Sequence, residues 1–198
     1  VLVWLYFKDQ VPRLGEIETP TKAIIIISAA GLCANYVFFS YSLNYVNAET
    51  SEAVIQLTSL FLIFGGVLFY KEQFSTSQKI GTLFIVVGLL LFFNDRLSDF
   101  KDLGSRQTMG VFIVFLSAIT WTVYSLLQKK LLRDFTSFQL LLMMYWFSVI
   151  VLLPFISPAA LFQLSGFEIF LLAFCCFNTV IAYGCFTEAL NCWDASKV

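Results

Sequence analysis

The residues of this chain best suited to chemistry are polar side chains that lie at helical spacing inside uncharged, apolar sequence. Ser117, Thr120, Trp121 and Tyr124 follow the three- and four-residue spacing that puts side chains on one helix face. In lipid, such groups need a hydrogen-bond partner or an aqueous cavity. We therefore predict a cavity wall that offers hydrogen bonds and aromatic faces to an amphiphilic solute. Helix–helix packing, which also concentrates small and polar residues, is the alternative.

A second stripe of small and polar residues, among them Ser28, Gly31 and Asn35, follows similar spacing along an earlier segment. For this stripe, a cavity wall and helix packing both remain open. The predicted cavity residues are Asn35, Tyr36, Ser117, Thr120, Trp121, Tyr124, Asn178 and Tyr183. Among these, we expect the face carrying Trp121 and Tyr124 to turn toward the last helix and its Asn178.

Two glutamates adjoin or interrupt apolar sequence. Glu188 is bounded on both sides by long apolar stretches, so it is the candidate for proton or cation coupling. Glu72 follows the end of an apolar run beside Lys71, which favours a structural role at the interface.

Enzymatic chemistry finds little support in the residues present. The chain has no His, which removes the commonest general base and metal ligand. It has no phosphate-binding loop of the form Gly-x-x-x-x-Gly-Lys-[Ser/Thr], and its five cysteines include no C-x-x-C pair. The aspartates at 95–102 interleave with basic residues, as in a solvated loop. We predict that the chain is not an enzyme and uses no cofactor and no metal.

Composition identifies lipid as the main solvent. Of 198 residues, 59% are hydrophobic and 13% are charged, whereas soluble domains have about 45–50% and about 25%. Mean hydropathy is +0.84. A net charge of -1 excludes nucleic-acid binding through a basic surface.

Six apolar stretches are predicted to cross the membrane as helices, since a helical span needs about 20 residues. Continuous apolar runs, without the alternation of barrel strands, favour helices over a barrel. Pro154 should end the fifth helix in a bend. Residues 1–7 resemble the end of a further helix, so we expect a fragment of a longer protein. The predicted spans are 23–46, 51–70, 79–94, 109–128, 137–155 and 167–190.

Lys and Arg distribution predicts the orientation. Loops 8–22, 71–79 and 129–134, with the C-terminal end, collect nine basic residues, whereas 95–108 collects three. Because basic loops stay in the cytoplasm, the first three loops should be cytoplasmic and 95–108 should face the opposite side.

An internal repeat divides the chain. Segments 36–48 and 183–195 share five identical residues at a fixed offset of 147. Five helices would fill each unit, and an odd number of spans inverts the second unit, an arrangement characteristic of secondary transporters. The predicted fold is an all-α polytopic membrane bundle. Residues 1–94 form the C-terminal part of the first five-helix repeat, 95–108 a polar inter-repeat loop, and 109–198 the N-terminal part of the second.

The run from Leu43 to Ala53, the acidic Glu72, and Gly81 and Gly88 on the next span resemble the EamA branch of the drug/metabolite transporter superfamily. This resemblance implies ten helices in two inverted repeats that move amino acids, metabolites or drugs. Two features depart from the family pattern: Lys71 stands where a Gly is usual, and the Pro common early in the fourth helix is missing.

The sequence thus predicts a secondary transporter of small organic solutes, integral to the plasma membrane and working by alternating access without ATP. The resemblance points to the bacterial inner membrane. Its expected partners are a small-molecule solute and the lipid bilayer, with no nucleic acid and an open oligomeric state. The alternative is a structural subunit of a membrane complex that transports nothing.

Overall fold

The computed structural model is helical throughout the residues it describes, which are 17–94, 105–155 and 158–198. No strand occurs in these ranges, which confirms the all-α fold class, and six helical stretches within them are long and apolar enough to cross a membrane. The predicted helix end at 1–7 and the acidic cluster at 95–102 lie outside the described residues. The helices are α2 (Thr19–Ser42), α3 (Ala48–Ile55), α4 (Leu57–Tyr70), α5 (Thr76–Phe93), α6 (Arg106–Leu131), α7 (Ser137–Leu152), η4 (Leu153–Phe155), η5 (Pro158–Gln163), α8 (Gly166–Cys192) and η6 (Ala195–Lys197).

The six predicted spans are present, with two differences in detail. The second is divided at Gln56, so that α3 and α4 together form one stretch. The fifth ends as α7 at Leu152, and the short η4 that follows contains Pro154. Proline lacks the N–H that would continue the helical hydrogen bonding, which explains the predicted bend.

Polar side chains fix where most of these helices begin. Three helices start with a reciprocal capping box, in which the cap side chain and the side chain three residues later each bond the other's backbone N–H. Asn47 and Ser105 cap α3 and α6 through a single side-chain acceptor. The capping boxes are Ser75 with Gln78, Thr136 with Gln139, and Ser165 with Glu168.

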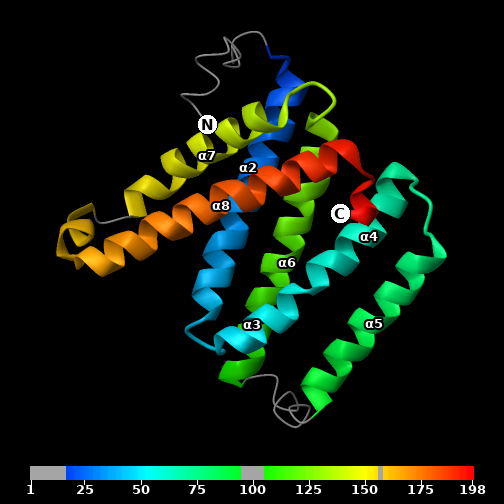
Figure 1. The fold of residues 1–198 in the computed structure, drawn as a ribbon, viewed down its shortest axis with the longest axis horizontal. Helices are drawn as coiled ribbons and strands as arrows, with labels where there is room; N and C mark the ends of the chain where they lie inside the picture. Colours follow the sequence, from blue (N-terminus) through cyan, green and yellow to red (C-terminus); the bar gives the residue numbers. More distant parts are fainter. Residues whose placement is uncertain (1–16, 95–104, 156–157) are drawn as a thin grey trace.

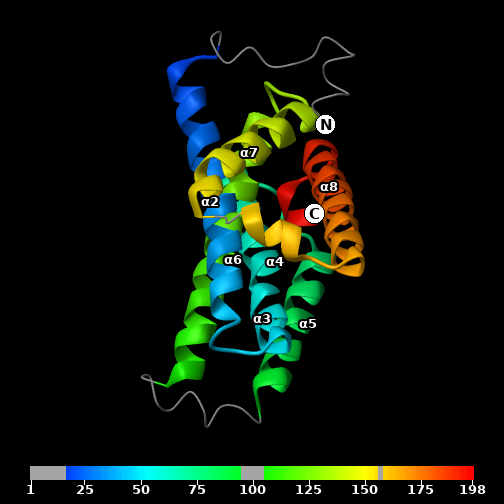
Figure 2. The ribbon, with the colours of Figure 1, turned by 90° about the vertical axis from the view of Figure 1, so that its left-hand side faces the viewer.

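The core forms where α2, α6 and α7 meet, and its buried residues include Ala29, Tyr124 and Met144. Helices α2 and α6 run alongside one another in opposite directions, α4 packs on α6, and α7 and α8 contact each other (Figures 1 and 2).

The start of α2 and the α6–α7 connection lie at the upper end in Figure 1, with the α4–α5 connection toward that end. Residues 43–47 and the start of α6 lie at the lower end. This alternation matches the order of ends predicted from the loop charges.

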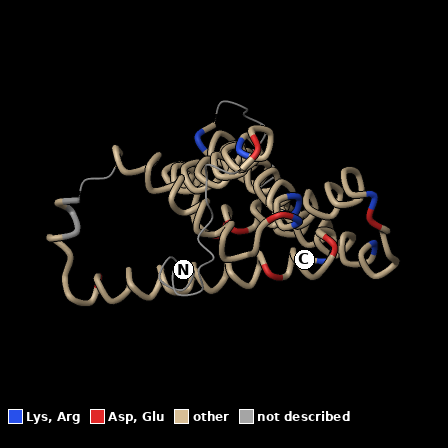
Figure 3. The backbone as a smooth tube through the Cα atoms, turned by 90° about the horizontal axis from the view of Figure 1, so that it is seen from above, with Lys and Arg blue, Asp and Glu red and all other residues tan. Residues whose placement is uncertain are grey.

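The exterior is apolar, as a lipid-solvated bundle requires. Helix α5 buries none of its residues, and Phe84 and Leu91 are each 71% exposed. Figure 3 shows charged residues gathered in a few groups, with long uncharged helical stretches between them. A continuous apolar surface of this extent is rare on a protein whose surface faces water.

Candidate solute site

A cavity of about 320 Å³ lies among five helices, with contributions from α2, α3, α4, α6 and α8. Its volume falls in the range of about 300–1,000 Å³ that holds small organic ligands. Residues before and after the predicted 95–108 loop therefore line the same cavity. The lining residues are Asn35, Tyr36, Phe39, Glu52, Ile55, Thr58, Trp121 and Tyr183.

Aromatic rings make up much of the cavity surface. Tyr36 and Tyr183 meet with ring centroids 6.1 Å apart. Trp121 packs on Phe186 with centroids 5.0 Å apart and remains half-buried. These contacts hold the rings of α2, α6 and α8 at the cavity edge, where they present flat apolar faces.

Two polar groups of the cavity, on Asn35 and Thr58, already use their donors within the protein. The amide nitrogen of Asn35 donates to the carbonyl and hydroxyl oxygens of Ser117, at 3.1 and 2.8 Å, which leaves the amide oxygen of Asn35 available as an acceptor. The hydroxyl of Thr58 donates to the backbone oxygen of Ile55 at 2.7 Å, so it too can only accept from a ligand.

Glu52 adds the only carboxylate among the described lining residues. Its side chain is exposed, and within the part of the chain that the structure describes it makes no hydrogen bond or ion pair. The sequence prediction missed this residue because it stands at the edge of a charge-free run. Its position just inside the span at 48–70 was the available signal, since ionisable residues within membrane helices are usually functional.

Ser117, Thr120 and Tyr124 pack against α2 and do not line this cavity, contrary to the predicted cavity wall. Ser117 and Tyr124 are fully buried, and the Thr120 hydroxyl donates to the Ser117 carbonyl at 2.9 Å. Tyr124 lies in the core, and its hydroxyl has no partner among the described residues. The helical spacing was correct, but the face it marks on α6 is the one that meets α2. Trp121, on the adjacent side, is the member of the set that reaches the cavity.

The small and polar residues of the α2 stripe face α6 in the contact between these two helices. Ser28 donates to the backbone oxygen of Tyr124 at 3.2 Å. A Cβ added at Gly31 would lie 3.0 Å from the backbone oxygen of Thr120, so the bare glycine lets α2 and α6 approach closely. Of the two interpretations left open for this stripe, the structure shows packing at Ser28 and Gly31. Asn35 both packs and lines the cavity.

Of the three predicted residues on α8, Tyr183 lines the cavity, whereas Asn178 and Glu188 lie away from it. Asn178 is exposed, so the face with Trp121 and Tyr124 meets α8 through Phe186 and Tyr183, not through Asn178. Glu188 is also exposed and accepts a hydrogen bond of 2.5 Å from the Ser137 hydroxyl at the start of α7. Coupling through Glu188 stays a prediction, and its contacts connect it to α7.

The described residues hold no group of three His, Cys, Asp or Glu that could bind a metal ion. Cys33 is buried and its thiol donates to the Ser148 hydroxyl at 3.2 Å, which is a packing contact. The remaining four cysteines are exposed on α8.

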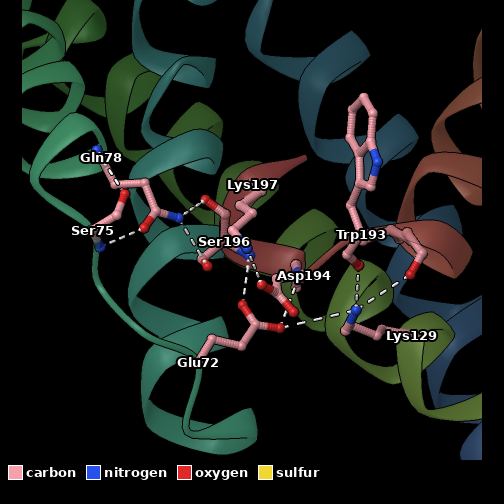
Figure 4. Close-up of polar contacts among 10 residues, drawn as sticks. Glu72, Ser75, Gln78, Lys129, Trp193, Asp194, Ser196 and Lys197 are labelled. Carbon is pink, nitrogen blue, oxygen red and sulfur yellow. Dashed lines mark hydrogen bonds and ion pairs between the residues drawn. The ribbon is translucent and has the colours of Figure 1, made fainter.

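A polar cluster, here called the η6 clamp, joins the ends of α4 and α6 to the segment after α8 (Figure 4). The Glu72 carboxylate accepts the backbone N–H groups of Ala195 and Ser196 at 2.8 and 2.7 Å. Lys129 approaches Glu72 at 3.9 Å, and it donates to the Trp193 carbonyl at 2.6 Å. Charge-assisted hydrogen bonds of this kind are the stronger ones in proteins. The clamp gives Glu72 a structural role.

Two further residues complete the η6 clamp. Gln78 donates to the carbonyl and hydroxyl of Ser196 at 2.6 and 3.0 Å. Gly66 lies directly beneath Glu72, and a Cβ at this position would collide with the Glu72 carboxylate. The clamp therefore draws on α4, α5 and α6 together.

A second cavity, of about 200 Å³, lies beside the η6 clamp. Trp121 lines this cavity as well as the larger one, so its ring borders both spaces. The residues around the second cavity are Ser59, Leu62, Ile63, Trp121, Phe186 and 195–198.

Comparison with known proteins gives one family and a small set of relatives. The sequence model of the EamA-like transporter family matches residues 1–94 and 108–198. The chain is 38% identical over 198 residues to an "Uncharacterized transporter" of Haemophilus influenzae, covering 100% of this chain and 64% of the relative. It is 33% identical over 195 residues to the "Uncharacterized inner membrane transporter YhbE" of Escherichia coli, covering 98% of this chain and 61% of the relative.

The chain thus spans about three fifths of the length of these curated relatives. The two parts of the family match leave out residues between 94 and 108, where the sequence predicts the inter-repeat loop. No solved structure matches the chain.

Proposed function

The chain belongs to the EamA-like transporter family, and we propose that it carries the solute site of a secondary transporter for small organic molecules. The six apolar helices and the relatives named as inner membrane transporters make it an integral inner membrane protein. Its solute class and its mechanism are the subject of the proposal.

The cavity of about 320 Å³ is the observation that carries this proposal. Both sequence halves supply its lining, through Tyr36 and Trp121 among others. A site between two halves suits transport, because movement of one half against the other can expose the site to alternate sides of the membrane.

The η6 clamp supports alternating access. The cavity residues from α2 lie in the half of that helix nearer residues 43–47, whereas Glu72 and Lys129 close the bundle toward its other end. Release of the clamp would open a path toward the basic loops. In alternating access, each state of the transporter is closed at one end of the bundle, and the η6 clamp closes that end in the conformation seen in this structure.

Transport without ATP is part of this proposal. The sequence contains no phosphate-binding loop, so a solute or ion gradient would supply the driving force. Glu188 stays a proposed coupling residue.

Uptake by the purified full chain in proteoliposomes tests the proposal. The vesicles would contain no ATP and would receive a panel of radiolabelled amino acids and nucleosides, with and without an imposed proton gradient. We expect saturable accumulation of at least one solute above protein-free vesicles. Absence of solute movement across the panel in both directions would contradict transport and favour a structural subunit.

A further inference from the structure

The cavity of about 320 Å³ combines one carboxylate with aromatic faces and two neutral acceptor groups, and its described lining includes no Lys or Arg. Building on the proposed function, we infer that Glu52 is the charge-recognising residue of this site and that the preferred solute carries a protonated amine on an apolar body. Nothing in the residues compensates the charge of Glu52 locally, since it has no hydrogen bond or ion pair within the described chain.

The neighbours of Glu52 favour a cation over an anion. The free amide oxygen of Asn35 and the Thr58 hydroxyl, whose proton is already donated, both offer lone pairs to a ligand donor. An ammonium group has three such donors and no acceptor. An anionic solute would face the charge of Glu52 without a cationic side chain in the described lining to compensate it, and only the neutral donors of the lining Tyr and Trp side chains could bind it.

The rings supply the second half of the recognition. Tyr36, Tyr183 and Trp121 line the same cavity as Glu52. Aromatic faces attract cations through the ring quadrupole. They also accept the apolar body of the solute by burial. A protonated amine with a small apolar or aromatic substituent satisfies both kinds of surface, whereas an inorganic cation satisfies only the first.

The α3 helix offers a matched control for the charge. Glu49 stands one turn before Glu52 on the same helix, is also exposed, and lies outside the cavity lining. Replacement of either glutamate by glutamine removes one negative charge at nearly unchanged size. General electrostatic attraction would respond to both substitutions, whereas recognition in the cavity responds only to Glu52→Gln.

Calorimetric titration of the full chain in nanodiscs, with empty nanodiscs subtracted, tests the inference. The probes are 2-phenylethylammonium, the neutral 2-phenylethanol and the anionic 3-phenylpropionate. We expect wild type and Glu49→Gln to bind the cation at least about tenfold more tightly than the alcohol. Glu52→Gln should lose that preference and Glu52→Asp should keep part of it. Monodisperse size-exclusion profiles for all variants establish that they are folded.

The outcomes separate the inference from the proposed function. A cation preference that survives Glu52→Gln, or one that is absent from wild type, would overturn the role of Glu52. Measured transport of neutral or anionic solutes in the vesicle panel would then leave the proposed function standing. Absence of binding for all three probes together with absence of transport would overturn both.

Discussion

Tyr36 in α2 and Tyr183 in α8 stand 147 positions apart in the chain and meet with ring centroids 6.1 Å apart. The same interval separates the first residues of α2 and α8, Thr19 and Gly166. In Figure 1, α2 runs downward, whereas α8 runs mainly from left to right and rises toward its C-terminal end; Figure 2 shows the same rise from the side. We propose that these helices are counterparts in the inverted repeat. Counterparts that touch must lie near the axis relating the two units, so this axis would pass beside the cavity.

The segments that follow the two helices agree with this assignment. Asn47 precedes α3, which begins at Ala48, and Asp194 precedes η6, which begins at Ala195, again 147 residues later. Asn and Asp are both favoured immediately before a helix because their side chains accept backbone N–H bonds. The η6 clamp would therefore hold the first turn of the counterpart of α3.

Replacement of Trp121 by alanine should reduce transport by about tenfold or more, because the site loses an aromatic face against which the solute packs. Trp146→Ala is the matched control, since Trp146 lies on α7 and is 52% exposed. Initial rates in proteoliposomes, normalised to reconstituted protein, measure the effect. Equal rates for both variants would remove Trp121 from the site.

Substitutions at Tyr124 should separate packing from solute contact. Tyr124→Ala should lower the free energy of unfolding by about 3–5 kcal/mol, because it empties a fully buried core position. Tyr124→Phe should stay within about 1 kcal/mol of wild type and retain transport, because the lost hydroxyl has no partner among the described residues. Thermal unfolding in detergent and vesicle uptake measure both properties. Loss of transport in a stable Tyr124→Phe variant would mean that the hydroxyl contacts solute.

Lys71→Gly should stabilise the protein by about 1 kcal/mol. Lys71 ends α4 with φ 55° and ψ 34°, a left-handed conformation that costs a residue with a Cβ about 1–2 kcal/mol. Glycine adopts it freely and is the usual residue at such a helix end. Lys79→Gly within α5 should instead destabilise by about 1 kcal/mol. Melting temperatures that shift in the same direction for both variants would contradict this account.

Glu72→Gln should loosen the η6 clamp. The substitution keeps the side-chain size but removes the charge that accepts two backbone N–H groups and pairs with Lys129. We expect maleimide to label a cysteine at position 59, in the second cavity, several-fold faster in a background without native cysteines. Asp134→Asn, an exposed change at the same end of the bundle, should leave the rate unchanged. Identical labelling rates in all three backgrounds would show that the clamp does not limit access.

Membrane orientation can be read from two exposed loop positions. Asn44 lies in the connection after α2, where its carbonyl accepts a 2.8 Å hydrogen bond from Arg106, and Asp134 lies between α6 and α7. The charge distribution predicts that the Asp134 loop is cytoplasmic. In intact cells, an impermeant maleimide should label Asn44→Cys and spare Asp134→Cys, both placed in a cysteine-free background. The reverse pattern would invert the orientation, whereas lysed cells should label both.

The membrane spans could be predicted from residues that are close in sequence, whereas the cavity lining depends on packing between distant parts of the chain. Helix ends follow from residues adjacent in sequence, such as Ser75 before α5 and Pro154 after α7, so the six spans were predictable. The interruption at Gln56 has no comparable local marker. The spacing of Trp121 and Tyr124 could not reveal which of two adjacent faces of α6 meets α2. That choice depends on contacts between residues far apart in the chain, such as Ser28 and Tyr124, which are 96 positions apart.

The position of Trp121 between two cavities has a kinetic consequence. One half-buried ring borders both spaces, whereas the η6 clamp joins the ends of several helices. Side-chain rotations take picoseconds to nanoseconds where a ring is free to move, but collective helix movements take microseconds to milliseconds. The Trp121 ring packs on Phe186 and is not free in this sense, so it moves with the helices that carry it. On the proposed mechanism, the contact between solute and Trp121 would therefore change on the slow timescale of the clamp, and solute selection and turnover would share one step.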